Sequence, residues 1–169
     1  AEGENTQSAN LALNNKIDGD STIYGSQDDH VRTIQWSMNA PITLEGYAFH
    51  TAGYLPEKLS PKTWNLYGTK DLNGEWVLLD AVEDGKLEEV GVNALSPTFS
   101  IDTPGEYQHY KIELITNIRD FSASYYSQYK FRELFLYVEK VEEPKELVNV
   151  NDQVNGGSIS IINAAEGEN

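Results

Sequence analysis

The chain has 169 residues, with 12 basic and 27 acidic side chains, so its formal net charge is −15 and its isoelectric point is near 4.4. That length fits one domain of ordinary size. The acidic balance argues against nucleic acid or an anionic membrane as the main partner, because both need a basic footprint. No apolar run approaches the length of a membrane span. The lack of cysteine excludes a disulfide framework and a cysteine-based metal site.

Short runs rich in Val, Ile, Thr and Tyr alternate apolar and polar residues, and no long stretch has the helical period, so we predict an all-β chain. Residues 31–38 place their apolar side chains on one face. A turn at 39–41 leads to a second predicted strand at 42–50. The apolar parity of that strand changes at Gly46, which a β-bulge at the glycine would explain.

Residues 60–80 predict a hairpin with two tryptophans in neighbouring strands. Trp64 and Trp76 are each followed two positions later by a leucine, which is the period of a half-buried strand. The connecting residues 71–74 have turn chemistry. We therefore expect both indoles, together with Trp36, to lie in a sheet-on-sheet core rather than on a binding surface.

Further strands are predicted at 98–102, 107–115 and 131–138, and the last of them is apolar on both faces. The charged residues 81–97 and the Tyr- and Ser-rich residues 116–130 are typical of loops.

The composition changes after Glu139, which divides the chain into a module at 1–139 and a charged linker at 140–169, the possible start of a following module. Residues 147–162 predict a hairpin around a Gly-Gly turn. The last five residues, Ala-Glu-Gly-Glu-Asn, are identical to the first five. We interpret that repeat as favouring excision from a longer protein, either a tandem array or a chain in which the match is accidental.

Asp18-Gly19-Asp20 is a candidate oxygen-ligand cluster for a hard cation such as Ca²⁺. The alternative is a plain Asx turn, which needs the same residues for a structural reason.

Several of these features together resemble the discoidin, or F5/8 type C, domains, a group that includes the bacterial carbohydrate-binding modules of family 32. The likeness runs from about Asn10 to Glu139 and is strongest in the two-tryptophan stretch. The residues that carry it are Pro61, Trp64, Leu66, Tyr67, Gly68, Asp71, Trp76, Leu79 and Glu133.

The resemblance implies a galactose-binding-like antiparallel β-sandwich of jelly-roll type. It also implies a non-catalytic carbohydrate-binding role in a secreted, multimodular bacterial protein, found outside the cell or at its surface. The expected partners are a glycan and other modules of the same polypeptide. By the same resemblance, a structural Ca²⁺ would be held by Asp18, Asp20 and Glu133, with a carbonyl or hydroxyl near Thr22.

In the resembled modules, loops at one end of the sandwich bind the sugar, and here these would be residues 24–32, 51–60 and 120–130. An aromatic face that stacks on sugar C–H bonds, beside a few directional polar groups, makes such a site. The candidates are Tyr24, His30, Arg32, His50, Tyr54, Tyr125 and Tyr126, with Tyr129 beside them. The alternative for each tyrosine is a half-buried loop anchor.

The sequence offers no thiol nucleophile, no His-Glu-x-x-His spacing, no Gly-x-Ser-x-Gly elbow and no phosphate-cradling glycine loop, so we do not expect an enzyme. Two hypotheses remain. The first is a carbohydrate-binding module, which requires exposed tyrosines that converge with His or Arg. The second is a structural or adhesive spacer that contacts protein rather than glycan.

Overall fold

The computed structural model describes residues 13–17, 19–24, 31–119, 128–139, 147–150 and 159–163. The side chains of Tyr24, Val148 and 159–163 are not part of this description. Its strands are β1 Ser21–Tyr24, β2 Arg32–Thr43, β3 Gly46–Thr51, β4 Pro61–Thr69, β5 Val77–Val82, β6 Phe99–Ser100, β7 Glu106–Asn117, β8 Gln128–Glu139, β9 Leu147–Asn149 and β10 Ile159–Asn163. A short helix, α2 Pro56–Leu59, and a 3-10 turn, η1 Leu87–Glu89, lie between strands.

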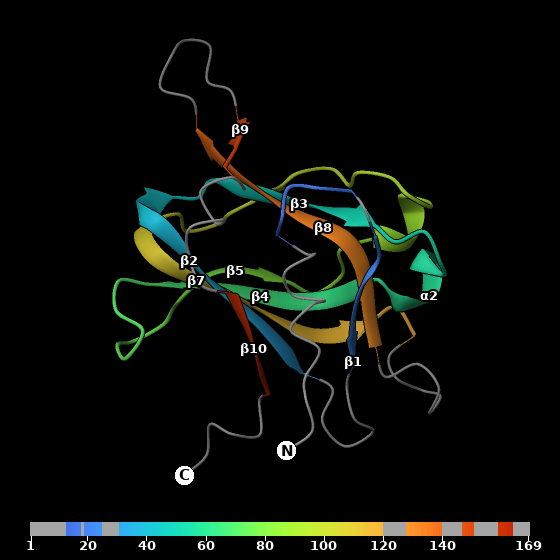
Figure 1. The fold of residues 1–169 in the computed structure, drawn as a ribbon, viewed down its shortest axis with the longest axis horizontal. Coiled ribbons are helices and arrows are strands. Elements are labelled where there is room, and N and C mark those ends of the chain that lie inside the picture. Colours follow the sequence, from blue (N-terminus) through green and yellow to red (C-terminus); the bar gives the residue numbers. More distant parts are fainter. Residues whose placement is uncertain are drawn as a thin grey trace.

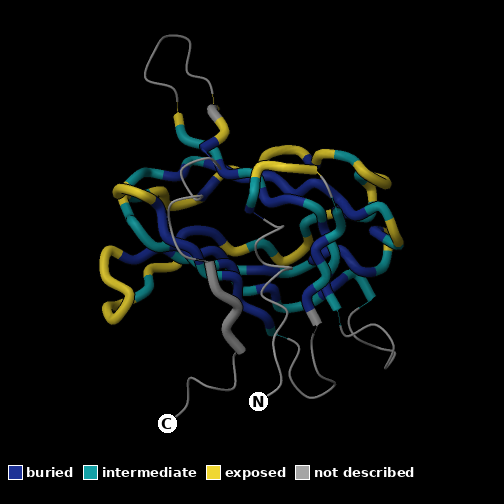
Figure 2. The backbone as a smooth tube through the Cα atoms, in the orientation of Figure 1, coloured by how far each residue is buried: buried dark blue, intermediate teal, exposed yellow. Residues whose placement is uncertain are grey.

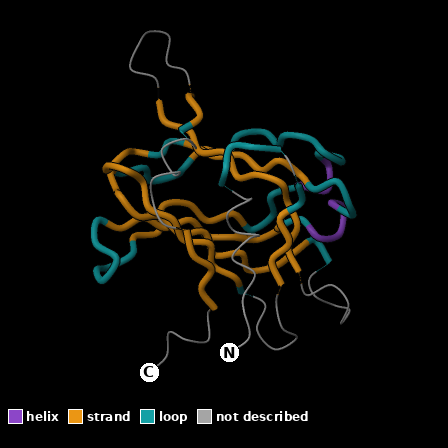
Figure 3. Tube along the Cα trace, viewed as in Figure 1, coloured by secondary structure: helices purple, strands orange, loops and turns teal. Residues whose placement is uncertain are grey.

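Two antiparallel sheets face each other, as Figures 1 and 3 show. The first sheet has the order β1-β8-β3-β6, with β9 also paired to β8, and the second has the order β10-β2-β7-β4-β5. This architecture confirms the predicted all-β antiparallel sandwich. Within the described residues, no helix is long and apolar enough to cross a membrane.

The core lies between the sheets, where the buried stretches of backbone face each other (Figure 2). It is rich in aromatic rings. Phe49 of β3 contacts Trp64 of β4 edge-to-face, with 5.0 Å between ring centroids, and Phe131 of β8 at 5.1 Å. Trp36 stacks on Tyr110 within the second sheet. The predicted inward residues of 31–38 and 107–115 are buried, because strict alternation turns every second side chain toward the other sheet.

A buried polar chain joins the two sheets inside this core. Trp64 Nε1 donates a hydrogen bond of 2.7 Å to Tyr47 Oη, and Tyr47 donates in turn to Asp80 Oδ2. Burial raises the pKa of the Asp80 carboxyl, although the hydrogen bond from Tyr47 acts in the opposite direction. Burial likewise raises the pKa of the Tyr47 phenol. Trp64 Nε1, Tyr47 Oη and Asp80 Oδ2 therefore each have a hydrogen-bond partner, as a low-dielectric interior requires.

The predicted turn at 39–41 and bulge at Gly46 are wrong. β2 continues through 39–41 to Thr43, with an irregularity in its pairing to β7 between Ser37 and Ile42. The chain reverses instead at residues 44–45, and this reversal causes the change in parity. Gly46 serves a different purpose: a Cβ there would lie 2.9 Å from Thr98 and 3.0 Å from the Phe99 carbonyl, so glycine lets β6 approach.

The prediction for the second tryptophan strand is also wrong. Trp64 is fully buried as expected, but Trp76 precedes β5 and is only half-buried. Leu79 fills the core, while Leu78 is 47% exposed. β5 is the edge strand of its sheet, and the pairing of β4 with β5 shifts register between Leu66 and Tyr67, so the inward positions differ from those that simple alternation predicts.

The predicted boundary at Glu139 and the hairpin at 147–162 do not match the structure. β9 pairs with β8 in the first sheet, and β10 pairs with β2 in the second. The two short strands therefore belong to opposite layers of the sandwich and do not pair with each other. Ile159 of β10 pairs with Trp36, 123 positions away, so no local pattern marks that strand. Leu147 of β9 pairs with Glu139 only eight positions away, so β9 pairs with the strand before it rather than with the strand after it. Both copies of the repeated pentapeptide fall outside the described residues.

Candidate functional site

The three loops that the sequence marks as a binding region emerge from one end of the sandwich. Tyr24 of β1 pairs with Gln128 of β8, which puts the end of one strand beside the start of the other. Thr51 of β3 pairs with Phe131 of β8. We call this end of the sandwich the loop end.

The second sheet brings its own strand termini to the same place. Pro61 at the start of β4 pairs with Asn117 at the end of β7, and Arg32 begins β2 opposite Leu114 of β7. Because antiparallel strands reverse direction at each connection, the turn between β4 and β5 lies at the opposite end (Figure 1).

Tyr54 is the exposed aromatic side chain of the described part of the loop end, with 61% of its surface accessible. Lys130 Nζ of β8 lies 5.1 Å from the centroid of its ring. Leu55 follows with a positive φ of 52° and starts α2, whose first residue is Pro56. An aromatic ring beside an ammonium group combines a stacking face with a hydrogen-bond donor, which is what a sugar ring needs.

A polar clamp fixes the backbone just before Tyr54. Oδ1 of Asp20 accepts a hydrogen bond of 2.9 Å from the Gly53 N–H and another of 2.9 Å from Arg132 Nε. A Cβ at Gly53 would lie 2.8 Å from Arg132 Nη2 and 3.1 Å from Asn93 Oδ1, so only glycine fits between these groups without a shift. The clamp joins the N-terminal segment, the β3–α2 loop and β8.

The other described sugar-site candidates are buried. Arg32 is 7% exposed, and its Nη1 donates to the Val31 carbonyl at 2.7 Å. His50 is also 7% exposed, lies opposite Glu133 across β3 and β8, and has Nδ1 3.2 Å from the Thr51 carbonyl. Tyr129 is fully buried and donates to the Leu114 carbonyl at 3.0 Å. These three side chains support the loop end from within, and Tyr54 reaches the solvent.

The remaining candidates cannot be placed against this geometry. His30, Tyr125 and Tyr126 lie outside the described residues, and the side chain of Tyr24 is not described. Their participation in a sugar site stays a prediction.

The residues expected to hold calcium lie along β8. Thr22 of β1 pairs with Lys130, Asp20 contacts Arg132, and the Asn15 N–H donates at 3.1 Å to Oε1 of the fully buried Glu133. The N-terminal segment and β8 therefore adjoin, as the calcium hypothesis requires. A buried carboxylate is the kind of oxygen ligand that a hard cation such as Ca²⁺ prefers.

Other features of this region compete with a cation. Oδ1 of Asp20 is already shared by Arg132 and Gly53. Across the part of the chain that the structure describes, no three acidic or histidine side chains form a group able to hold a metal ion. Asp18 lies outside the described residues, so the calcium site stays a prediction.

Sequence reasoning missed Lys130 and Arg132 as contributors to the loop end. The alternation Lys130-Phe131-Arg132 could have indicated them. Phe131 is buried in the core, so the two basic side chains on either side of it must point the other way. Their partners, Tyr54 and Asp20, are 76 and 112 positions away, so only the three-dimensional pairing reveals them.

No protein-family model and no curated protein matches this chain. Among solved structures, the family 32 carbohydrate-binding module of Streptococcus pneumoniae EndoD superposes with a TM-score of 0.56 at 19% identity, over 81% of this chain and 88% of that one. The fold is that of the discoidin domains.

Two further solved structures superpose on this chain with the same fold. An F5/8 type C domain from Bacteroides fragilis has a TM-score of 0.58 at 16% identity, over 76% of this chain and 78% of that one. The family 32 module of Clostridium perfringens NanJ, solved in complex with galactose, has a TM-score of 0.53 at 15% identity, over 77% of this chain and 84% of that one. The predicted resemblance to discoidin and family 32 modules is therefore confirmed at the level of the fold.

Proposed function

We propose that this protein is a non-catalytic carbohydrate-binding module that binds a glycan at its loop end. The observation that carries the proposal is Tyr54, an exposed aromatic ring held beside the Lys130 ammonium on a fixed loop. The fold supports it, since discoidin-type sandwiches include modules solved with bound sugar.

The geometry suits a shallow site with modest affinity. The backbone before Tyr54 is tied to Asp20, and the residues after it begin α2, so binding requires little ordering of this loop. Lys130 can donate to a sugar hydroxyl while the tyrosine ring meets the apolar face of the sugar.

The direct test is a glycan array followed by calorimetry with the best ligand. We expect Tyr54→Ala to weaken binding about tenfold or more, the equivalent of about 1.4 kcal/mol. The matched control is Trp76→Ala, which removes another partly exposed aromatic ring at the opposite end of the sandwich. Equal loss in both variants, or no binding across a broad panel, would contradict the proposal and favour a spacer module.

An enzymatic role finds little support in the described residues. Ser37 Oγ and His109 Nδ1 lie 2.7 Å apart, which is the distance between a nucleophile and its base. However, these two residues face each other directly across β2 and β7, where such cross-strand pairs stabilise a sheet. We therefore assign the pair a structural role.

The setting of the module belongs to the same proposal. We infer that it works outside the cell or at the cell surface, as one part of a multimodular polypeptide, and that a calcium ion supports its N-terminal segment. The family resemblance supports the setting, and the buried Glu133 carboxylate supports the ion. Detection of the native protein in the extracellular or cell-surface fraction would test the location.

A further inference from the structure

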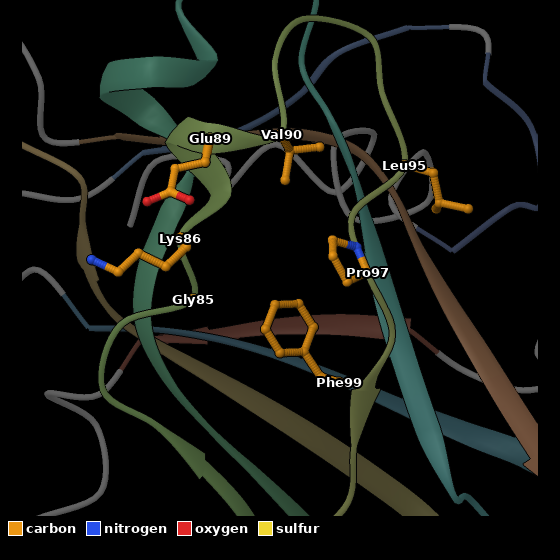
Figure 4. A pocket seen from close by; sticks show the side chains of 7 residues that line it. All are labelled: Gly85, Lys86, Glu89, Val90, Leu95, Pro97 and Phe99. Carbon is orange, nitrogen blue, oxygen red and sulfur yellow. The ribbon is translucent and has the colours of Figure 1, made fainter.

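A pocket of about 380 Å³ opens on the flank of the sandwich, and Tyr54 is not among the residues that line it. It is lined by the loop that crosses from β5 to β6 and by Phe99 of β6, as Figure 4 shows. That loop reaches the loop end at its far side, where the Asn93 N–H donates to the Ala52 carbonyl at 3.2 Å. We call the pocket the flank pocket. Its lining is Gly85, Lys86, Glu89, Val90, Leu95, Pro97 and Phe99.

The flank pocket has one polar side and one apolar side. Lys86 and Glu89 lie together on one side, Leu95 and Pro97 lie on the other, and the ring of Phe99 projects between them (Figure 4). A volume of this size is near the lower end of the range for ligand sites, about 300–1,000 Å³, so it suits about one or two sugar rings.

The floor of the flank pocket is rigid. The Phe99 ring packs edge-to-face on Trp64 at 5.1 Å and stacks on Tyr47 at 5.5 Å between centroids. Gly85 lies directly on Trp64, since a Cβ there would come 2.0 Å from the indole. The aromatic surface at the base of the flank pocket is therefore an extension of the core.

Backbone hydrogen bonds fix the walls of the pocket to both sheets. The Gly85 N–H donates to the Lys62 carbonyl of the second sheet at 2.9 Å. On the other side, the Ser96 N–H donates to the Phe49 carbonyl of the first sheet at 2.8 Å. Lys86 also holds a positive φ of 53°, a conformation that non-glycine residues keep only when their surroundings enforce it. The pocket is preformed and needs little ordering to accept a ligand.

The charges at its rim limit the class of ligand. Lys86 Nζ is paired with Asp84 at 2.6 Å, and the negative charges of Asp84, Glu88 and Glu89 all act on it. The three carboxylates outnumber the two ammonium groups that act on them, Lys86 and Lys62, so the rim repels an anionic ligand. A purely apolar ligand would cover Lys86 and Glu89 without replacing their hydrogen bonds to water. An uncharged ligand with one apolar face and hydroxyl groups at its edge satisfies both sides.

We propose that the flank pocket is a second sugar subsite, for an uncharged pyranose whose C–H face rests on Phe99 and whose hydroxyl groups bind Lys86 and Glu89. The inference rests on the proposed glycan-binding function and adds a site separate from the one at Tyr54. Two sites on one module would bind a branched or extended glycan more tightly than either site alone.

The test is a two-dimensional ¹H–¹⁵N NMR titration with galactose, glucose, mannose and N-acetylglucosamine, and with galacturonic acid as the charged comparison. Backbone amides of Gly85, Val90 and Leu95 report on the flank pocket, and those of Tyr54 and Lys130 report on the loop end. We expect at least one neutral sugar to shift the flank amides, and galacturonic acid to shift them much less.

Two variant pairs separate the flank pocket from its surroundings. Leu95→Glu puts a carboxylate on the apolar wall and should weaken the flank response about tenfold, whereas Val92→Glu alters an equally exposed residue outside the lining (57% against 51% exposed) and should not. If Leu95→Glu fails to fold, the pair Glu89→Ala and Glu83→Ala makes the same comparison on the polar side.

The possible results are distinguishable. Shifts at the loop end alone would overturn the flank subsite and leave the proposed function standing. Shifts at neither place with any sugar would overturn both. Flank shifts that galacturonic acid produces as strongly as the neutral sugars would overturn the uncharged ligand class, and flank shifts that Leu95→Glu leaves unchanged would overturn the site.

Discussion

The two tryptophans of the central hairpin, Trp64 and Trp76, should differ sharply in what they contribute to stability. Trp64 is fully buried, donates to Tyr47 Oη at 2.7 Å and packs edge-to-face against Phe49 and Phe99 at 5.0 and 5.1 Å. Trp76 is half-buried outside the strands, with the Lys111 ammonium 5.1 Å from its ring centroid.

Truncation of Trp64 to alanine removes a core ring and leaves a cavity, which costs about 3–5 kcal/mol in comparable cores. The lost hydrogen bond adds about 1 kcal/mol at most, because Tyr47 still donates to Asp80. Truncation of Trp76 removes a cation–π contact at an exposed site, worth about 0.5–1 kcal/mol, and little buried area. Since a domain is stable by only about 5–15 kcal/mol, the two variants should be easy to tell apart.

Urea unfolding followed by far-UV circular dichroism measures the difference without relying on indole fluorescence. With a slope of about 2 kcal/mol/M, Trp64→Ala should lower the midpoint by about 1.5–2.5 M, and Trp76→Ala by less than about 0.5 M. If the slopes of both variants equal that of the wild type, the midpoint shifts report changes in stability alone. A Trp64→Ala protein with a midpoint near that of the wild type, or a Trp76→Ala protein that loses as much, would refute the assignment of core and surface.

Three further predictions concern polar groups. Burial raises the pKa of Asp80 above its ordinary value of 3.8, so the folded state holds that proton more tightly than the unfolded chain. The wild type should therefore gain stability relative to Asp80→Asn as the pH falls from 7 toward 3.8, and a constant difference between the two unfolding free energies would contradict this. Calcium at about 100 times its Kd should stabilise the wild type by about 2.7 kcal/mol and Glu133→Gln by much less; no rise in Tm with calcium, and no calcium in metal analysis, would remove the ion from the proposal. Asp20→Ala frees Gly53 and should weaken glycan binding about three- to tenfold without touching Tyr54, whereas unchanged affinity by calorimetry would show that the clamp is irrelevant to binding.

Alternation along single strands predicted most of the core correctly. Ile34 and Trp36 of β2 and Ile112 of β7 are all buried, because a strand between two layers must turn every second side chain inward. The same rule failed at Trp76. Three apolar residues in a row at 77–79 leave the parity open, and the outcome was decided by the register shift against β4.

The candidate site was harder to predict because it depends on long-range pairings. The three loops could be named from their composition, and the strand pairings bring their ends together. The sequence does not show which of these side chains reach solvent. A tyrosine in a loop can be either a buried anchor or an exposed binding residue, and the two look the same in sequence. Tyr129 is an anchor and Tyr54 is exposed, and the difference arises from the inward parity of β8 and the clamp at Gly53.

The outer edge of β8 connects stability to the proposed function. Three separate segments cover this edge: β1 pairs with its start, Asn15 bonds to Glu133 in its middle, and β9 pairs with its end. An uncovered edge strand would invite pairing with another chain, so these segments protect the sheet. Asp20, which lies between the first two of these contacts, also holds the loop that carries Tyr54. The interactions that close the first sheet therefore also position the exposed ring at the loop end, and a change that loosens the N-terminal segment should reduce stability and glycan affinity together.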